Sequence, residues 1–293
     1  MERRLLVTTF SIVALDRQTG EVGVAVASRF LAVGAVVPWA QAGVGGVVTQ
    51  AWANLSFGPG GLRLLAEGHS ATEVVRTLTD ADEGRAHRQV GIVDAQGRAA
   101  AWTGRECFAW AGHRTGDGFT CQGNILSGPG VVEAMAGTFS RTAGALPERL
   151  LAALSAGQDA GGDSRGQQSA ALLVVKEKGS YGGYLDRYID LRVDDDSTPI
   201  ARLRGLLELH RLYFVTGEPV LISLTADIVR EVQEILRQRG FTPDPPTGIY
   251  DDRTKDAFRR LCSVENFEER WREDDRVDQE ILHYLRRRYG RGP

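Results

Sequence analysis

The chain has 293 residues, of which 42% are hydrophobic and 25% are charged, and its formal net charge is −3. This composition is ordinary for a soluble globular protein, and the length suits one large domain and a small one. The balanced charge gives no reason to expect a nucleic-acid partner. No apolar run reaches the roughly 20 residues of a membrane helix, so we expect no membrane partner.

The cysteines and histidines show no metal pattern. Cys107, Cys121 and Cys262 have no zinc-site spacing and cannot form an even disulfide framework, and the five histidines show no ligand spacing. We therefore predict neither a metal nor a cofactor. The cysteine usage fits a reducing compartment, and we expect a cytoplasmic protein.

The first segment has two interpretations. The segment Glu2-Arg3-Arg4 and the apolar stretch that follows it up to Leu15 are similar to a secretion signal, but no small-residue cleavage site follows Leu15. The stretch "LVTTFSIVAL" also pairs naturally with "GEVGVAVAS" through the turn "DRQTG". We prefer the second interpretation, a β-hairpin.

Further along, "AVVPWAQAG" and "GGVVTQAW" are strand-like, and we expect the glycine-rich "FGPGG" to be a loop. Ser70 and Glu73 have the spacing of a capping box, which predicts a helix over "SATEVVRTL". A hairpin with its turn at residues 94–97 follows, then the strand "GDGFTCQGNIL" and helices near 129–139 and 147–156.

The strands "QQSAALLVVKE" and "YIDLRVDDD" come next, and then a helix that begins at Thr198-Pro199. Strands, helices, strands and a helix do not make a βαβ alternation. This order predicts an α+β fold in which antiparallel sheets are layered with helices outside them.

A change of composition around residues 216–223 suggests a boundary between a domain at 1–218 and a domain at 219–293. Beyond it, "TADIVREVQEILRQRG", a segment begun at Asp251 or Asp252, and "VDQEILHYLRRRYG" are helical. We predict a small three-helix domain, and we expect its aromatic residues to form the core, namely Phe241, Tyr250, Phe258, Trp271 and Tyr284.

Thr9, in the first predicted strand, has both a structural and a chemical interpretation. Threonine is a good strand former, so the residue needs no function to be there. A threonine hydroxyl is a weak nucleophile that needs a base beside it. Cleavage of the peptide bond before Thr9 would supply that base, because an α-amine has a pKa near ~8.

Three long motifs favour the chemical interpretation. They are the stretch from "TFSIVALDRQTGEVGVAVASRF" to "VVTQAWAN", the segment "QGNILSG" and the segment "GGDSRGQQSAALLVV". Together they resemble a bacterial family named only as domain-of-unknown-function family 1028. The resemblance covers roughly residues 8–215. It implies the N-terminal-nucleophile (Ntn) hydrolase fold, a four-layer αββα sandwich in which the nucleophile, here Thr9, heads the first strand.

The resemblance also implies roles for residues downstream, with departures. Ser28 stands where proteasome-type relatives carry an aspartate, and Arg29 matches their arginine. Asp163 matches the aspartate of their Asp-x-x-Ser segment, but Gly166 replaces its serine. Their lysine has no match, because no lysine precedes Lys176.

Other polar residues complete the candidate site. We expect Gln50 and Asn124 to hold an oxyanion, Asn54 to be a further donor there, and Asp163 to orient the amine of Thr9. Arg29 or Arg165 suits a carboxylate on the substrate, with Ser28 beside them. For each of these residues a turn or a strand end is the structural alternative.

The tail has its own resemblance. The elements "VQEILRQRG", "PTGIYDDRT" and "AFRRL" within residues 222–289 are similar to peptidoglycan-binding domains. That resemblance implies contact with peptidoglycan fragments, such as recycled wall peptides. A packed helical appendage or an interdomain lid is the alternative.

Two functions therefore stay open. The first is an amidohydrolase acting on a small amide or peptide-like bond, with Thr9 as nucleophile. The second is a catalytically silent binding or scaffold protein that recognises peptidoglycan-derived fragments, since fold alone does not fix function. Because symmetric dimers are the commonest oligomers, we expect a homodimer.

Overall fold

A computed structural model describes residues 6–7, 9–214, 218–242 and 244–290. The chain divides into two compact units, Met1–Leu207 and Glu208–Pro293, here called the first and the second unit. The boundary suggested by the sequence, between residues 218 and 219, lies further along the chain and stays a prediction.

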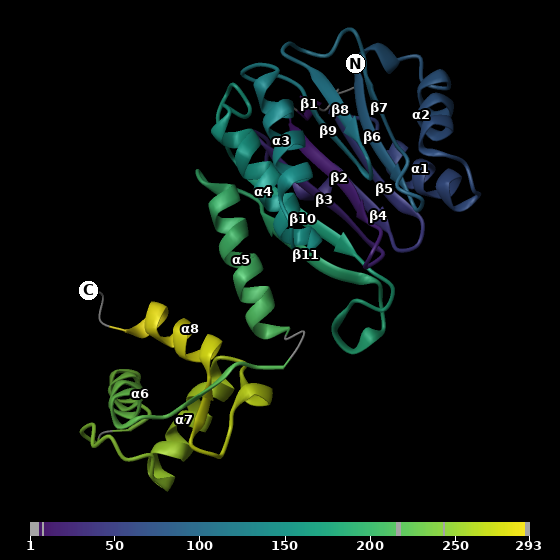
Figure 1. Cartoon of the computed structure of the whole chain (residues 1–293). Helices are drawn as coiled ribbons and strands as arrows, with labels where there is room; N and C mark the ends of the chain where they lie inside the picture. Colours follow the sequence, from purple (N-terminus) through teal and green to yellow (C-terminus); the bar gives the residue numbers. More distant parts are fainter. Residues whose placement is uncertain (1–5, 8, 215–217, 243, 291–293) are drawn as a thin grey trace. The chain divides into compact units, whose positions relative to one another are not determined.

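The first unit contains two antiparallel sheets (Figure 1). One has the strand order β1-β5-β6-β7, with β4 also paired to β5, and the other has the order β11-β10-β3-β2-β9-β8. The strands of the first sheet are β1 Leu6–Val7, β4 Pro38–Gln41, β5 Gly45–Trp52, β6 Arg88–Asp94 and β7 Ala99–Thr103. Those of the second are β2 Phe10–Asp16, β3 Glu21–Ser28, β8 Gly112–Gly116, β9 Phe119–Gly123, β10 Ser169–Val175 and β11 Arg187–Val193.

Helices cover the outer face of each sheet (Figure 1). Residues of α1 (Phe57–Ala66) and α2 (Ala71–Asp80) share a core with β5 and β6. Residues of α3 (Gly130–Arg141), α4 (Leu146–Asp159) and the first part of α5 (Pro199–Tyr213) share a core with β2, β3, β9 and β10. The α+β class predicted from the sequence is therefore confirmed.

A third core lies between the two sheets, and strand alternation separates it from the helix-covered cores. On β2, Phe10 and Ile12 belong to the core beneath α3 and α4, whereas Val13 belongs to the inter-sheet core. Because successive side chains of a strand point to opposite faces, Thr9 and Ser11 lie on the same face as Val13. The hairpin predicted for the first segment is confirmed over β2, which pairs with β3 from Phe10↔Ala27 to Asp16↔Glu21. Leu6 and Val7 are not part of it, since β1 pairs with β5 of the other sheet.

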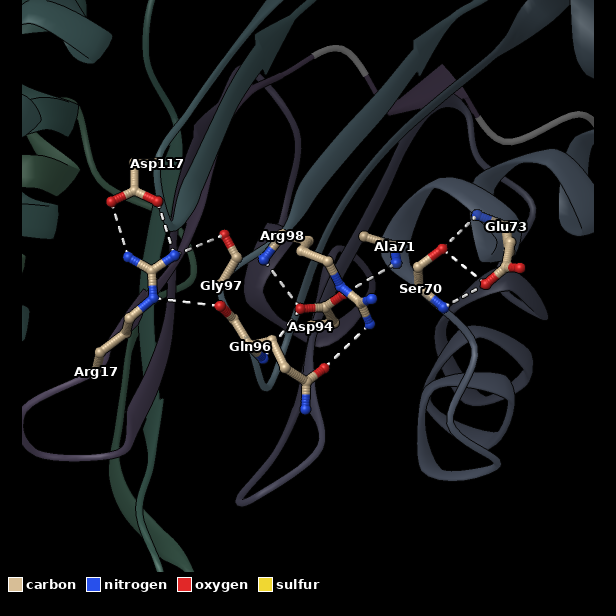
Figure 2. Close-up of polar contacts among 9 residues, drawn as sticks. All are labelled: Arg17, Ser70, Ala71, Glu73, Asp94, Gln96, Gly97, Arg98 and Asp117. Carbon is tan, nitrogen blue, oxygen red and sulfur yellow. Dashed lines mark hydrogen bonds and ion pairs between the residues drawn. The ribbon is translucent and has the colours of Figure 1, made fainter.

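At the opposite end of β2 from Thr9, polar contacts join three turns and a helix start (Figure 2). Arg17 donates to both carboxylate oxygens of Asp117, at 2.8 and 2.7 Å, and to the backbone carbonyls of Gln96 and Gly97. The buried carboxylate of Asp94 accepts from the backbone N–H groups of Gln96, Arg98 and Ala71. Ala71 is the first residue of α2, so Asp94 joins this helix to the β6–β7 hairpin.

The predicted capping box is confirmed, because Ser70 and Glu73 each bond the backbone N–H of the other. The expectation that "FGPGG" is a loop is wrong, since α1 begins at Phe57. Gly58 sits in its first turn, and a Cβ there would lie 2.3 Å from the ring of Trp39. Glycine thus serves close packing here, and Pro59 is compatible with a first turn.

Within its described residues, the second unit contains the last part of α5 and three further α-helices, α6 Ala226–Gln238, α7 Asp252–Val264 and α8 Gln279–Tyr289. Thr225, Asp251 and Asp278 cap their N-termini. Phe258 and Tyr284 are buried in its core, and the other predicted core aromatics pack against it, namely Phe241, Tyr250 and Trp271. A short sheet of β12 (Leu221–Ser223) and β13 (Arg276–Asp278) was not predicted, because three-residue strands carry little periodicity.

Within the described residues, no helix combines the length and the apolar character that crossing a membrane requires.

We predict that Asp94→Asn lowers the free energy of unfolding by about 2–3 kcal/mol, because the new amide N–H₂ would face backbone donors that now share a buried carboxylate. Denaturant unfolding of the wild type and the variant measures the loss, provided that the free energy of unfolding falls with denaturant at the same slope in both proteins. Asp117→Asn is the matched control, since that carboxylate is 83% exposed, and its loss should be smaller. Equal losses in the two variants would contradict the role given to Asp94.

Candidate functional site

The strand register brings three predicted residues to one end of the inter-sheet layer. Phe10 pairs with Ala27 on β3 and with Gly123 on β9, so Thr9 lies beside Ser28 on one side and Asn124 on the other. Gln50 enters from β5 of the facing sheet. The side chains of all four residues are at least 98% buried.

Thr9 is held at two atoms. Its Oγ1 donates to Ser28 Oγ at 3.3 Å. Its carbonyl oxygen accepts from the backbone N–H of Asn124 at 3.0 Å and from Nε2 of Gln50 at 3.2 Å. The backbone of Thr9 is thus fixed between a strand end of its own sheet and a side chain of the other sheet.

Buried amides connect this end of the two sheets. Nε2 of Gln50 also donates to Oε1 of Gln89 at 2.8 Å, and Nδ2 of Asn124 donates to the same oxygen at 3.1 Å. Oε1 of Gln50 accepts from Ser11 Oγ at 2.7 Å, and Gln122 donates to Ser11 from β9. The two N–H groups of Gln50 are therefore engaged with Thr9 and Gln89.

Gln89 and Gln122 are polar residues that the sequence analysis did not single out. Their signal was a glutamine at an inward position of an apolar strand, as in "RQVGIVD" and "FTCQG". Gly91 makes room for one of them, because a Cβ at Gly91 would lie 2.1 Å from Oε1 of Gln122. A glycine on β6 therefore lets an amide side chain cross between the sheets.

One buried atom in this network is not paired. Oδ1 of Asn124 has no hydrogen-bond partner among the described residues, although the side chain is 1% exposed. An unpaired buried acceptor costs free energy, so its position marks a place where a donor would be stabilising.

Asp163, Arg165 and Arg29 form a second cluster beside Ser28. Asp163 accepts from the backbone N–H of Arg29 at 3.2 Å and from Nε and an NH₂ group of Arg165 at 3.0 and 2.8 Å. The backbone N–H of Ser164 donates to Ile125 O, which ties this loop to the residue after Asn124. The guanidinium of Arg29 donates to Gln167 O at 2.7 Å.

Asn54 is placed apart from this network. Its Nδ2 donates to Asp82 at 3.2 Å, and its Oδ1 accepts from the backbone and hydroxyl of Ser56. These contacts stabilise the turn before α1, which is the structural role that the sequence analysis gave as the alternative to a role in binding.

Two residues next to the site have left-handed backbone. Ala51 follows Gln50 with φ 65°, and Ile125 follows Asn124 with φ 51°. Such values are unfavourable for a residue with a Cβ, most of all for a β-branched one. Strain of this kind often clusters at functional sites, where neighbouring contacts hold it in place.

The intact chain gives Thr9 no basic partner within the described residues, where Ser28 is the hydrogen-bond partner of its hydroxyl. Lys176 pairs with Glu21 at the other end of β3, about 23 Å from Ser28 by the rise of a strand. Burial raises the pKa of Cys107 to about 11, so this thiol stays protonated at neutral pH. Among the described residues, no group of three or more His, Cys, Asp or Glu side chains could hold a metal ion.

The second unit contains a surface cavity of about 670 Å³. Arg286 spans part of it, because its guanidinium donates to both oxygens of Glu231 at 2.7 and 2.8 Å. Tyr289, also in its lining, lies under the guanidinium of Arg239 at 4.6 Å. The cavity therefore combines charged groups with an aromatic face.

We predict that Ala51→Gly changes the free energy of unfolding by less than about 0.5 kcal/mol, because relief of left-handed strain offsets the lost buried methyl group. Ala14→Gly, in the extended strand β2, is the matched control and should destabilise by about 1–2 kcal/mol. Chemical denaturation of both variants tests this. A loss at Ala51 as large as that at Ala14 would show that Ala51 is not strained.

Residues 9–203 match the "Family of unknown function (DUF1028)", and residues 213–285 match the family described as "Putative peptidoglycan binding domain". The chain is also similar to the crystal structure of protein SPO2555 from Silicibacter pomeroyi, which is described as DUF1028. The two sequences are 33% identical, the TM-score is 0.64, and the match covers 72% of this chain and 91% of SPO2555. No curated protein matches the chain. The chain therefore belongs to the DUF1028 family and carries a C-terminal peptidoglycan-binding-like domain.

Proposed function

We propose that the first unit is an amidohydrolase of the N-terminal-nucleophile type, and that Thr9 becomes its nucleophile when the bond before it is cut. The main observation behind this proposal is the position of Thr9. It is buried at the head of β2, its hydroxyl bonds to Ser28, and its carbonyl is held by Asn124 and Gln50. We also assign the two facing sheets with their outer helices to the Ntn-hydrolase sandwich.

The position of the bond in the chain supports this proposal. β1 ends at Val7 in one sheet, and β2 begins at Phe10 in the other. The chain therefore passes from one sheet to the other across Thr9 and the residue before it. Thr8 itself lies outside the described residues.

Maturation and turnover then follow the same chemistry. In maturation, Thr9 Oγ1 attacks the carbonyl carbon of residue 8, an ester C–O bond forms as the amide C–N bond breaks, and the hydroxyl proton passes to the released α-amine. Water hydrolyses the ester and leaves a free hydroxyl and the leader's carboxylate. In turnover the α-amine accepts the hydroxyl proton and passes it to the leaving amine of the substrate.

The neighbouring residues receive roles from their contacts. Gln50, whose two N–H groups are engaged, holds the Thr9 carbonyl and is a positioning residue. Asn124 has one N–H left for an oxyanion, and its unpaired Oδ1 would accept from the α-amine of Thr9. Asp163 orients that end of the site through Arg29 and Arg165, whose charges suit a carboxylate on the substrate.

The first prediction from this proposal concerns the intact mass of the purified chain. We expect a species that begins at Thr9 to accumulate on incubation. Thr9→Val should stay at full length, because valine keeps the shape of threonine and lacks the hydroxyl. Thr9→Ser should still be cut, because it keeps the nucleophile. The mature chain should hydrolyse a small amide at a rate at least 10³-fold above that of Thr9→Val.

Thermal unfolding of all three chains is the control, since Thr9→Val must remain folded for its mass to be informative. A wild-type chain that stays at full length after long incubation, or a Thr9→Val chain that is cut like wild type, would exclude Thr9 as the nucleophile.

A second candidate is a binding protein without catalysis. Two observations favour it, namely that the described residues place no base beside Thr9 and that residues 213–285 match the family of peptidoglycan-binding domains. We propose the cavity beside Arg286 and Tyr289 as the place where a peptidoglycan fragment would bind. Titration of the full-length chain with a soluble muramyl dipeptide, followed by calorimetry, tests this. Binding with no change in the mass of the protein or the ligand would support it.

A further inference from the structure

The outer edge of β5 is shared by two strands. β4 pairs with the first half of β5, from Pro38↔Val48 to Gln41↔Gly45. β1 pairs antiparallel with its last residues, Leu6 with Trp52 and Val7 with Ala51. The stretch of β5 next to the candidate site is therefore covered by the segment that precedes Thr9, here called the leader.

This edge is a main-chain binding surface. An edge strand presents unpaired N–H and C=O groups, and an extended peptide can add to it as a further strand. Loss of the leader would leave those groups at Ala51 and Trp52 without the partner strand that they have in the intact chain. The left-handed φ of Ala51 lies in this same stretch, immediately after Gln50.

We propose that the substrate is an extended peptide whose acyl part occupies the leader's place on the edge of β5, pairing with Ala51 and Trp52. This inference rests on the proposed function. The reason is that the leader and the substrate undergo the same reaction at Thr9. Maturation and turnover both form an ester between Thr9 Oγ1 and an acyl group, so the acyl chain of the substrate has to approach that oxygen as the leader does.

Aromatic residues surround Trp52 at the far end of this edge. Its ring lies 4.3 Å from the ring of His87 and 6.2 Å from that of Phe108, which is 49% exposed. His87 also pairs with Glu106 at 2.9 Å. Recognition at the edge is through the backbone, so the acyl residues of the substrate can differ in their side chains. The aromatic rings around Trp52 would lie beyond these residues.

The binding test uses a chain that folds at full length and loses its leader afterwards. A recognition sequence for a specific protease replaces residues 3–8 of Thr9→Ala, and the cut leader is removed by gel filtration. Fluorescence anisotropy then measures binding of the labelled peptide Arg-Arg-Leu-Leu-Val-Thr, which is residues 3–8 of this chain. We expect the cut chain to bind at least tenfold more tightly than the uncut chain.

Backbone N-methylation is the matched control. Methylation at both amides corresponding to Leu6 and Val7 should weaken binding by about tenfold, because one of these two adjacent N–H groups faces β5 and loses its ladder hydrogen bond, whereas methylation at Arg4 should not weaken binding. Equal binding by the cut and uncut chains, or equal effects of the two methylations, would overturn the inference. Neither readout depends on hydrolysis.

A kinetic test separates this inference from the proposed function. For the mature chain with Thr9, kcat/KM for the aminomethylcoumarin amide of acetyl-Leu-Val-Thr should exceed that for acetyl-Thr at least tenfold. Hydrolysis of both amides at the same rate would overturn peptide pairing at the edge of β5 and leave the proposed hydrolase activity standing. Peptide binding at this edge with no hydrolysis by any mature chain would support the pairing and overturn the hydrolase activity.

Discussion

The buried amides between the sheets of the first unit have to be hydrogen-bonded, and this requirement fixes the end of the molecule that carries Thr9. An unpaired buried amide costs about 1–3 kcal/mol, so Gln50, Gln89 and Gln122 constrain one another across two sheets. Apolar residues alone would allow the sheets to slide, whereas an amide that donates to a particular carbonyl allows one register. Thr9 takes its position from that register, because Gln50 bonds to its carbonyl oxygen.

Rigidity and burial have opposite consequences for chemistry at Thr9. Fixed hydrogen bonds preorganise the backbone, which favours catalysis because no reorganisation is needed during the reaction. A side chain with 0% exposure, however, meets neither water nor substrate in the intact chain. The left-handed residues Ala51 and Ile125 stand beside this closed arrangement. Under the proposed function, the intact chain would be a precursor in which the residues of the site are in place but Thr9 is not accessible.

The features that could be predicted from the sequence depend on residues close together in the chain, whereas the features that were missed depend on residues far apart in it. The capping box at Ser70 and the helix start at Asp251 or Asp252 are local signals, read within four residues, and both predictions were confirmed. The start of α1 was not predicted, because the glycine at position 58 is required by close packing against Trp39, a residue of the distant strand β4. The meeting of Thr9, Ser28 and Asn124 was expected only through family resemblance, and Gln89 was not expected at all, since strand pairing across long separations leaves no local pattern.

A single cut before Thr9 would change three properties of the site together. It would create the α-amine, a base where the described residues give the Thr9 hydroxyl only Ser28 as its partner. It would supply a donor close to the buried Oδ1 of Asn124, where the described residues provide none. It would also free the leader to leave the edge of β5 at Ala51 and Trp52. Nucleophile activation and substrate access would then depend on one covalent event, so a folded but uncut chain would be inactive without any separate inhibitor.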